Sequence, residues 1–172
     1  MILFLDNYDS FSYNIIRKIY CKNIKINFKN FNIKNINFKL IYEKILLFGP
    51  GPNNVVNSNL NTLILDKFLN KKKIIGVCLG HQVIDCYFGY YIYKLNIFFH
   101  GQFKNILFYN KKYKIFIFKK LISYNSLSCL GIKLQNFSKF NFELFIVYNF
   151  FLKLKTFQFH PESILSSKNN FI

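Results

Sequence analysis

The feature that most constrains this chain is residues 74–82, where a short apolar run leads into a cysteine with a glycine on either side. Gly76 stands two residues before Cys78 and Gly80 two residues after it, which gives the pattern G-x-C-x-G. This is the thiol counterpart of the G-x-S-x-G nucleophile elbow, where a strand turns sharply into a helix. The elbow strains its central residue, and bulky neighbours would clash where strand and helix cross. We therefore predict a strand, an elbow and a helix, with the Cys78 side chain exposed above a sheet.

The same position makes Cys78 a candidate nucleophile. A thiol at a helix N-terminus lies in partial positive charge, which favours the reactive thiolate. A second interpretation is a buried core cysteine whose neighbouring glycines only allow close packing. The motif alone leaves both interpretations open, because its structural context decides between them.

Composition indicates a single domain covering residues 1–172. Hydrophobic residues make up 52% of the chain and aromatic residues 20%, which is enough for a substantial core. The four cysteines form no C-x-x-C pair, so zinc-ribbon and thioredoxin-like proteins find no support. Polar side chains interrupt the apolar runs, and no run is long enough to span a bilayer. We expect a cytoplasmic protein with no membrane partner.

A formal net charge of +17 is of the kind found in nucleic-acid-binding proteins. The lysines, however, are scattered along the chain instead of being grouped on one element. They accompany abundant Asn, Ile, Phe and Tyr, whose codons are rich in A and T, so a base-composition bias explains the mixture. Because charge alone is a weak signal, we expect no nucleic-acid partner. A basic nucleic-acid-binding module is the rival hypothesis, and it predicts strongly salt-sensitive binding.

Strand-like and helix-like patterns alternate in the first half of the chain and predict an α/β fold. Residues 2–5, 44–48 and 74–77 resemble the buried strands of a parallel sheet covered on both faces. Apolar residues recur at helical spacing within 11–19 and 60–68. Further strands are predicted at 24–28, 90–95, 105–109, 113–118, 132–137, 142–148 and 154–159, with 123–127 as a polar connector. The expected fold is an open, mostly parallel central sheet flanked by helices, with additional antiparallel strands.

A loop follows each of the predicted strands 2–5 and 44–48, at the sheet edge where ligands bind in such folds. In the first loop, Asp9 or Ser10 can cap the next helix. In the second, residues 49–54 (GPGPNN) form a loop that is rigid at its prolines and bare at its glycines, so its N–H groups can approach a ligand closely. The alternative for the second loop is a simple turn, and for Asp6 and Asp9 it is capping and turn formation alone.

A histidine and a carboxylate lie near the end of the last predicted strand. His160 and Glu162 are two residues apart, so in extended backbone their side chains project to the same side. A carboxylate beside an imidazole fixes its tautomer and stabilises the cation that forms on protonation. The zinc-deaminase signature also contains H-x-E, but no P-C-x-x-C follows here. Because parallel strands end at one sheet edge, this pair can meet Cys78 there as a cysteine triad.

Three segments together resemble the class I (triad) glutamine amidotransferases. Residues 77–82 (VCLGHQ) and 160–165 (HPESIL) carry the resemblance, in the same order as in that family. Residues 6–14 (DNYDSFSYN) narrow it to the glutaminase subunits of anthranilate synthase and of aminodeoxychorismate synthase. The resemblance covers nearly the whole chain, and it leaves open which of these two branches the chain serves.

The resemblance implies hydrolysis of L-glutamine through a cysteine thioester. Cys78 is expected to attack the side-chain amide, His160 to act as base and then as acid, and Glu162 to orient His160. Backbone N–H groups of Gly51 and Leu79 are expected to stabilise the oxyanion. The full set of substrate-binding residues implied is Gly49, Pro50, Gly51, Leu79, Gln82, Ser126 and Leu127. The ammonia is expected to pass to a separate synthase subunit that aminates chorismate, and no metal or organic cofactor is implied.

The chain departs from the family pattern at several positions outside the triad. Residues 48–53 read FGPGPN, where the family usually has S-P-G-P-G before another proline. Asn125 stands where a histidine is usual before Ser-Leu, and Gln102 where a lysine is usual after His-Gly. The sequence also stops soon after Ser166. We expect activity because the three triad residues are present; the alternative is a non-catalytic scaffold that keeps the motifs by descent.

Overall fold

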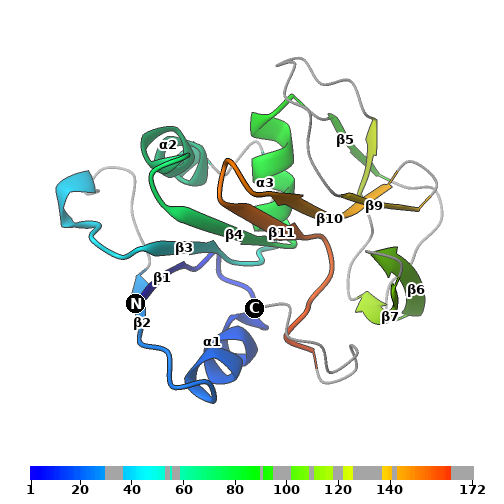
Figure 1. Cartoon of the computed structure of the whole chain (residues 1–172), viewed down its shortest axis with the longest axis horizontal. Coiled ribbons are helices and arrows are strands. Elements are labelled where there is room, and N and C mark those ends of the chain that lie inside the picture. Colours follow the sequence, from blue (N-terminus) through cyan, green and yellow to red (C-terminus); the bar gives the residue numbers. More distant parts are fainter. Residues whose placement is uncertain are drawn as a thin grey trace.

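A seven-stranded sheet forms the centre of the computed structural model (Figure 1), with the strand order β2-β1-β3-β4-β11-β10-β9. The first five strands in this order are parallel, whereas β10 is antiparallel to both β11 and β9. The structure describes residues 1–29, 37–52, 55, 59–89, 91–94, 102–108, 111–117, 122–125, 137–140 and 143–163. The strand bounds are β1 Ile2–Leu5, β2 Ile26–Lys29, β3 Ile45–Phe48, β4 Lys73–Val77, β9 Phe137–Phe140, β10 Glu143–Asn149 and β11 Leu154–Phe157. The predicted α/β fold with an open, mostly parallel sheet is confirmed.

Helices cover both faces of this sheet (Figure 1). One face carries α1 (Ser12–Tyr20), the other carries α2 (Asn59–Phe68) and α3 (Leu79–Tyr87), and a short 3-10 helix, η2 (Phe38–Leu40), precedes β3. Side chains alternate along β1, so that Ile2 and Phe4 join the core beneath α1 while Leu3 and Leu5 join the core beneath α2 and α3. Because both faces are buried, the strand is apolar throughout.

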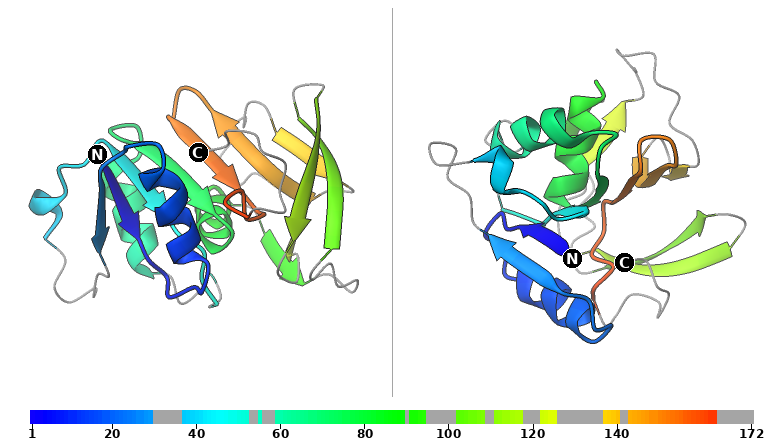
Figure 2. Two further views of the ribbon diagram at one scale, coloured as in Figure 1. Left: turned by 90° about the horizontal axis from the view of Figure 1, so that it is seen from below. Right: turned by 60° about the vertical axis from the view of Figure 1, so that its left-hand side comes forward.

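Among the described residues, four further strands form two antiparallel pairs beside the central sheet. Strand β5 (Tyr91–Lys94) pairs with β8 (Ile122–Asn125), and β6 (Gln102–Phe108) pairs with β7 (Lys111–Ile117). Figure 2 shows the β6–β7 hairpin at the side of the molecule where β9 and β10 lie. The predicted polar connector is wrong for residues 123–125, which belong to β8. Pairing with β5 outweighs the polar composition there, since strand preference depends strongly on the partner strand.

The register of the sheet brings the loops of interest to one edge. Leu5 of β1 lies opposite Phe48 of β3, and Val77 of β4 lies opposite Phe157 of β11. The segments that follow these four residues therefore leave the sheet side by side, at the carboxyl ends of parallel strands. In the described part of the chain, no helix is both long and apolar enough to cross a membrane.

Candidate active site

Cys78 occupies a strained elbow between β4 and α3. Its backbone angles are φ 53° and ψ −103°, in a region that is costly for a residue with a side chain. Hydrogen bonds hold it on both sides: its N–H donates to the Phe157 carbonyl at 2.7 Å, and its carbonyl accepts the N–H of Gln82 at 3.1 Å. The predicted strand–elbow–helix unit is therefore present.

Close packing explains the two glycines that flank the elbow. A Cβ on Gly80 would collide with the carbonyl oxygen of Phe48, and a Cβ on Gly76 would come within 2.9 Å of the Gly80 carbonyl. Both obstacles are backbone atoms, which cannot rotate aside as the end of a side chain can. The prediction that bulky residues would clash at this crossing is confirmed.

The Cys78 side chain is buried, with 3% of its surface exposed, which corrects the prediction of an exposed thiol. It belongs to the core cluster on the α1 face together with Phe157 and Phe159. The segment after β11 covers it, because Phe159 of that segment packs in the same core cluster. Cys86 differs: burial and the charge of Asp85 raise its pKa to about 11, which keeps it a neutral thiol near pH 7.

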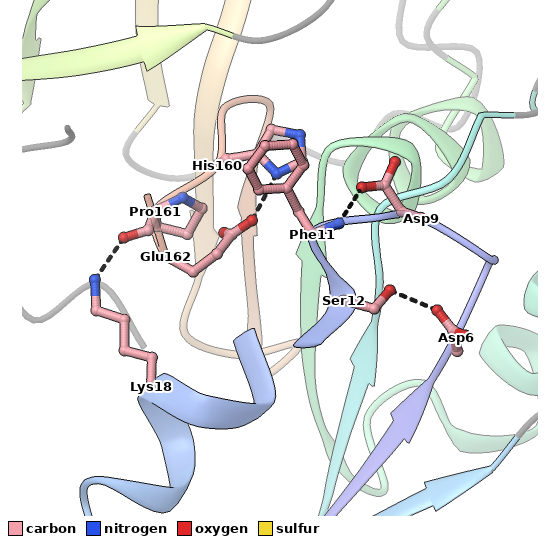
Figure 3. A network of polar contacts seen from close by, with 8 residues as sticks. All are labelled: Asp6, Asp9, Phe11, Ser12, Lys18, His160, Pro161 and Glu162. Carbon is pink, nitrogen blue, oxygen red and sulfur yellow. Dashed lines mark hydrogen bonds and ion pairs between the residues drawn. The ribbon is translucent and has the colours of Figure 1, made fainter. Parts of the chain in front are cut away.

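His160 and Glu162 form a buried pair after β11 (Figure 3). Nδ1 of His160 lies 2.6 Å from Oε1 of Glu162. The predicted contact is therefore present, but its backbone is a turn instead of an extended strand. Strand β11 ends at Phe157, and the N–H of Ser163 donates to the His160 carbonyl at 3.2 Å. The turn brings the carboxylate back towards the ring.

The surroundings of His160 favour its protonated form. Burial disfavours the charged ring and lowers its pKa, but hydrogen bonds and negative charge from Cys78 and Glu162 outweigh that effect and raise the pKa to about 10. An imidazolium at neutral pH is therefore expected between a sulfur and a carboxylate. This is the arrangement that an activated cysteine nucleophile requires.

Asn7 holds the Gly49-Pro50-Gly51 loop in place. Its Nδ2 donates to the Gly49 carbonyl at 2.8 Å, and its Oδ1 accepts from Nδ2 of Asn61 on α2 at 2.9 Å. The N–H of Gly49 donates to the Leu5 carbonyl at 2.9 Å, which continues the β1–β3 pairing by one residue. The loop is thus tied to β1 and α2 and is more than a simple turn.

Gly51 and Leu79, the two predicted oxyanion donors, are neighbours in space. A Cβ on Gly51 would lie 2.6 Å from Cδ2 of Leu79 and 2.7 Å from Cβ of Asn7. Only a bare residue fits so close to the first residue of α3. Pro50, between the two glycines of the loop, is buried.

The carboxylates of the first loop accept hydrogen bonds within that loop and from Ser12. The predicted helix cap at Asp9 or Ser10 is wrong, because the N-cap of α1 is Phe11 and it has no side-chain cap. Asp6 accepts the N–H of Tyr8 at 3.1 Å and the hydroxyl of Ser12 at 2.5 Å. Asp9 accepts the N–H of Phe11 at 2.9 Å, directly before α1 (Figure 3). These bonds fix where α1 begins relative to the sheet edge.

Side chains from the first turns of α3 join this helix to β11 and to the segment after it. Nε2 of Gln82 donates to Oε1 of Gln158 at 3.2 Å. Gln158 precedes His160 by two residues. His81 has Nδ1 2.7 Å from Oγ1 of Thr156 and Nε2 3.4 Å from Oδ2 of Asp85. Burial raises the pKa of Asp85 well above its usual range. These contacts hold α3, which Cys78 precedes, against β11, which His160 follows.

Several of these contact residues were not predicted, although the sequence holds a signal for two of them. Asn61 shares the buried face of α2 with Ile64, Leu65 and Phe68, and Thr156 is fully buried in β11. A polar residue at a core-facing position needs a buried partner, and that is the signal. Lys18, which donates to the Pro161 carbonyl, carried no signal of this kind.

The remaining predicted positions are only partly described. Ser126 and Leu127 lie outside the described residues. The backbone of Asn125 lies in β8 opposite Tyr91, and that of Gln102 lies in β6 opposite Ile117. Among the described residues, no three His, Cys, Asp or Glu side chains gather into a group that could hold a metal ion.

Comparison with known proteins gives matches over nearly the whole chain. The sequence model of the family "Glutamine amidotransferase class-I" matches residues 3–172. Anthranilate synthase component 2 of Buchnera aphidicola is 34% identical over 180 residues, covering 96% of this chain and 89% of that protein. The aminodeoxychorismate/anthranilate synthase component 2 of Bacillus subtilis is 29% identical over 178 residues, covering 97% of this chain and 90% of that protein.

A solved structure supports the same fold. The crystal structure of a glutamine amidotransferase from Thermotoga maritima superimposes with a TM-score of 0.72 at 14% identity, covering 94% of this chain and 75% of that one. The fold, the elbow and the sequence matches agree, and the chain belongs to the class-I glutamine amidotransferase family.

Proposed function

We propose that this chain is the glutaminase subunit of anthranilate synthase, which releases ammonia from L-glutamine for tryptophan biosynthesis. The observation that carries the proposal is the buried His160–Glu162 pair at the end of β11, beside the strained Cys78 elbow at the end of β4. The relatives named anthranilate synthase component 2 support the choice of complex.

In the first half of the reaction, the Cys78 sulfur attacks the side-chain carbonyl carbon of glutamine. A C–S bond forms, and the carbonyl oxygen becomes an oxyanion facing the backbone N–H groups of Gly51 and Leu79. Each such donor typically contributes about 10²–10³ in rate. The imidazolium of His160 then gives its proton to the amide nitrogen, the C–N bond breaks, and ammonia leaves a glutamyl thioester.

In the second half, water attacks the thioester carbon and His160 takes its proton. The C–S bond breaks, glutamate leaves, and Cys78 is regenerated beside an imidazolium that Glu162 stabilises. Gln82, Ser126 and Leu127 hold the amino-acid end of the substrate, while Gly49 and Pro50 shape the loop beside it. No metal or organic cofactor takes part in this scheme.

The ammonia passes to a chorismate-binding synthase subunit, so the chain works within a hetero-oligomer. The names of the relatives, which call each a component of a synthase, support such a partner. We further propose that residues 1–172 act as one domain in the cytoplasm, without a nucleic-acid or membrane partner.

The second candidate is the glutaminase subunit of aminodeoxychorismate synthase, in folate biosynthesis. The Bacillus subtilis relative supports this candidate, because its name gives both aminodeoxychorismate synthase and anthranilate synthase. The large subunit that co-purifies with the chain distinguishes the branches, because the product that it makes from chorismate identifies it.

The test is glutamate release by the chain together with its synthase partner. Cys78→Ser should lower the rate by about 10⁴-fold or more, since removing a nucleophile disables the whole triad. Cys86→Ser, in the helix that follows Cys78, is the matched control and should stay within about threefold of the unmodified protein. Equal release by the unmodified protein and Cys78→Ser rejects the proposal. Failure of a glutamine-analogue electrophile to label Cys78 favours the non-catalytic scaffold.

A further inference from the structure

Lys18 of α1 reaches the turn that carries the acid–base pair (Figure 3). Its Nζ donates to the Pro161 carbonyl at 2.6 Å. Pro161 stands between His160 and Glu162, so this bond acts on the backbone that sets the spacing of the pair. The side chain of Lys18 is half-buried.

The same helix also contacts the imidazole. Phe11, directly before α1, has its ring centroid 5.2 Å from that of His160, with the planes tilted by 52° (Figure 3). Lys18 follows Phe11 by seven residues, which is two helical turns, and so projects on the same side of α1. The helix therefore holds the acid–base turn at two points, one on the ring and one on the backbone.

Charge adds to this contact. Burial lowers the pKa of Lys18, the charge of Glu162 raises it, and that of Lys22 lowers it. The interaction with Glu162 is mutual, so the ammonium opposes the effect of the carboxylate on the imidazole. Within the described part of the chain, the charge of Cys78 also acts on the ring, and Asp9 accepts the N–H of Phe11, whose side chain packs on that ring.

We propose that Lys18 is a positioning residue for the acid–base pair: it holds the His160–Glu162 turn against α1 and offsets part of the Glu162 charge at the imidazole. This inference rests on the proposed function, because it concerns how the base of that reaction is held. Lys18 acts through Pro161 and Glu162 and does not touch the substrate. Without it the turn loosens, and the imidazolium loses its proton less readily.

The experiment compares Lys18→Met, which removes both charge and donor, with Lys18→Arg, which keeps both. In Lys18→Met, kcat for glutamine hydrolysis should fall about tenfold because the base is misplaced, with KM changed less than about twofold. The NMR titration of the His160 ring, assigned with His160→Gln, should move upward by about half a pH unit. In Lys18→Arg, kcat and the His160 titration should match those of the unmodified protein. Arg17 is an exposed neighbour on α1, and Arg17→Met should change neither quantity.

Lys18→Gln is the second charge-free variant and replaces Lys18→Met if that protein does not fold. An unchanged kcat and an unchanged His160 titration in a folded charge-free variant overturn the positioning role, as does an equal loss in Arg17→Met. The titration needs no turnover, so the two proposals can fail separately. A protein that releases no glutamate but whose titration moves rejects the glutaminase and keeps the role of Lys18.

Discussion

The two halves of the candidate active site are held by different means. Cys78 is fixed by backbone: a strained elbow, two main-chain hydrogen bonds, and glycines that let a strand and a helix cross. His160 is fixed by side chains from other positions, namely Glu162, Phe11 and, through Pro161, Lys18. The sulfur half should therefore be sensitive to added volume, whereas the imidazole half should be sensitive to changes of charge.

The largest effect is expected where volume is added at the elbow. Gly80→Ala should destabilise the fold by about 3 kcal/mol or more and abolish glutamate release, because its Cβ would collide with the Phe48 carbonyl. Denaturant unfolding measures the loss. Gly49→Ala is the comparison and should lose less, since its Cβ would meet the tip of the buried Phe4 ring at 2.8 Å and the Leu5 carbonyl at 3.0 Å, whereas all three nearest obstacles at Gly80 belong to Phe48 and lie closer. An equal loss in both variants would show that the elbow crossing is not the tighter site.

The second effect tests charge at the imidazole half. Glu162→Gln keeps the shape of the side chain but removes the carboxylate that stabilises the imidazolium, so kcat/KM should fall about 10²-fold. The pKa of His160 should fall as well, which an NMR titration measures. Asp6→Asn removes a carboxylate from the same sheet edge and should change kcat/KM less than about fivefold. A comparable loss of kcat/KM in Asp6→Asn would show that any carboxylate at this sheet edge matters, and not Glu162 in particular.

A third effect links His160 to stability. Its pKa is raised from 6.5 to about 10, so the folded protein holds this proton more tightly than the unfolded chain does. The resulting stabilisation is complete below pH 6.5 and is lost as the pH rises to about 10. Relative to His160→Gln, the free energy of unfolding should fall across that window by about 1.4 kcal/mol per pH unit. A constant difference between the two proteins at all pH values contradicts this.

The smallest effect is expected on the contacts that join α3 to β11. Thr156→Val removes the hydroxyl that meets Nδ1 of His81 and should cost about 1 kcal/mol of stability. Glutamate release should stay within about threefold, because neither Cys78 nor His160 loses a direct contact. Thr62→Val, on the half-buried side of α2, is the control and should cost less than about 0.5 kcal/mol. A large loss of activity in Thr156→Val would show that the contacts between α3 and β11 also help to hold the imidazole half.

The elbow could be predicted from the sequence because its causes are local. Two glycines and an apolar run within a few residues define a strand, a turn and a helix, and the structure has all three. The burial of Cys78 could not be predicted in this way. Its cover comes from the segment after β11, and only the pairing of β4 with β11 brings that segment close.

The contact between His160 and Glu162 was predicted on an incorrect backbone. Residues two apart can meet along an extended strand or across a turn, and spacing alone does not distinguish these cases. The partners Asn61, Lys18 and Gln158 depend on how distant elements pack, which no short motif encodes. Residues 123–125 were assigned to a connector because their pairing with β5 cannot be read from their own composition.

The place of β11 in the sheet has a consequence for how the chain is made. This strand lies directly beside β4, although β5 to β10 come between them in the chain. During synthesis on the ribosome, β4 is made long before its neighbour β11. Until β11 is made, one edge of β4 has no partner strand, and the N–H of Cys78 lacks the Phe157 carbonyl to which it donates. A nascent chain therefore contains Cys78 long before it contains His160, the base of the proposed mechanism. On the proposed mechanism, ammonia release cannot begin before residues 160–162 have been made, so a nascent chain that ends before them consumes no glutamine.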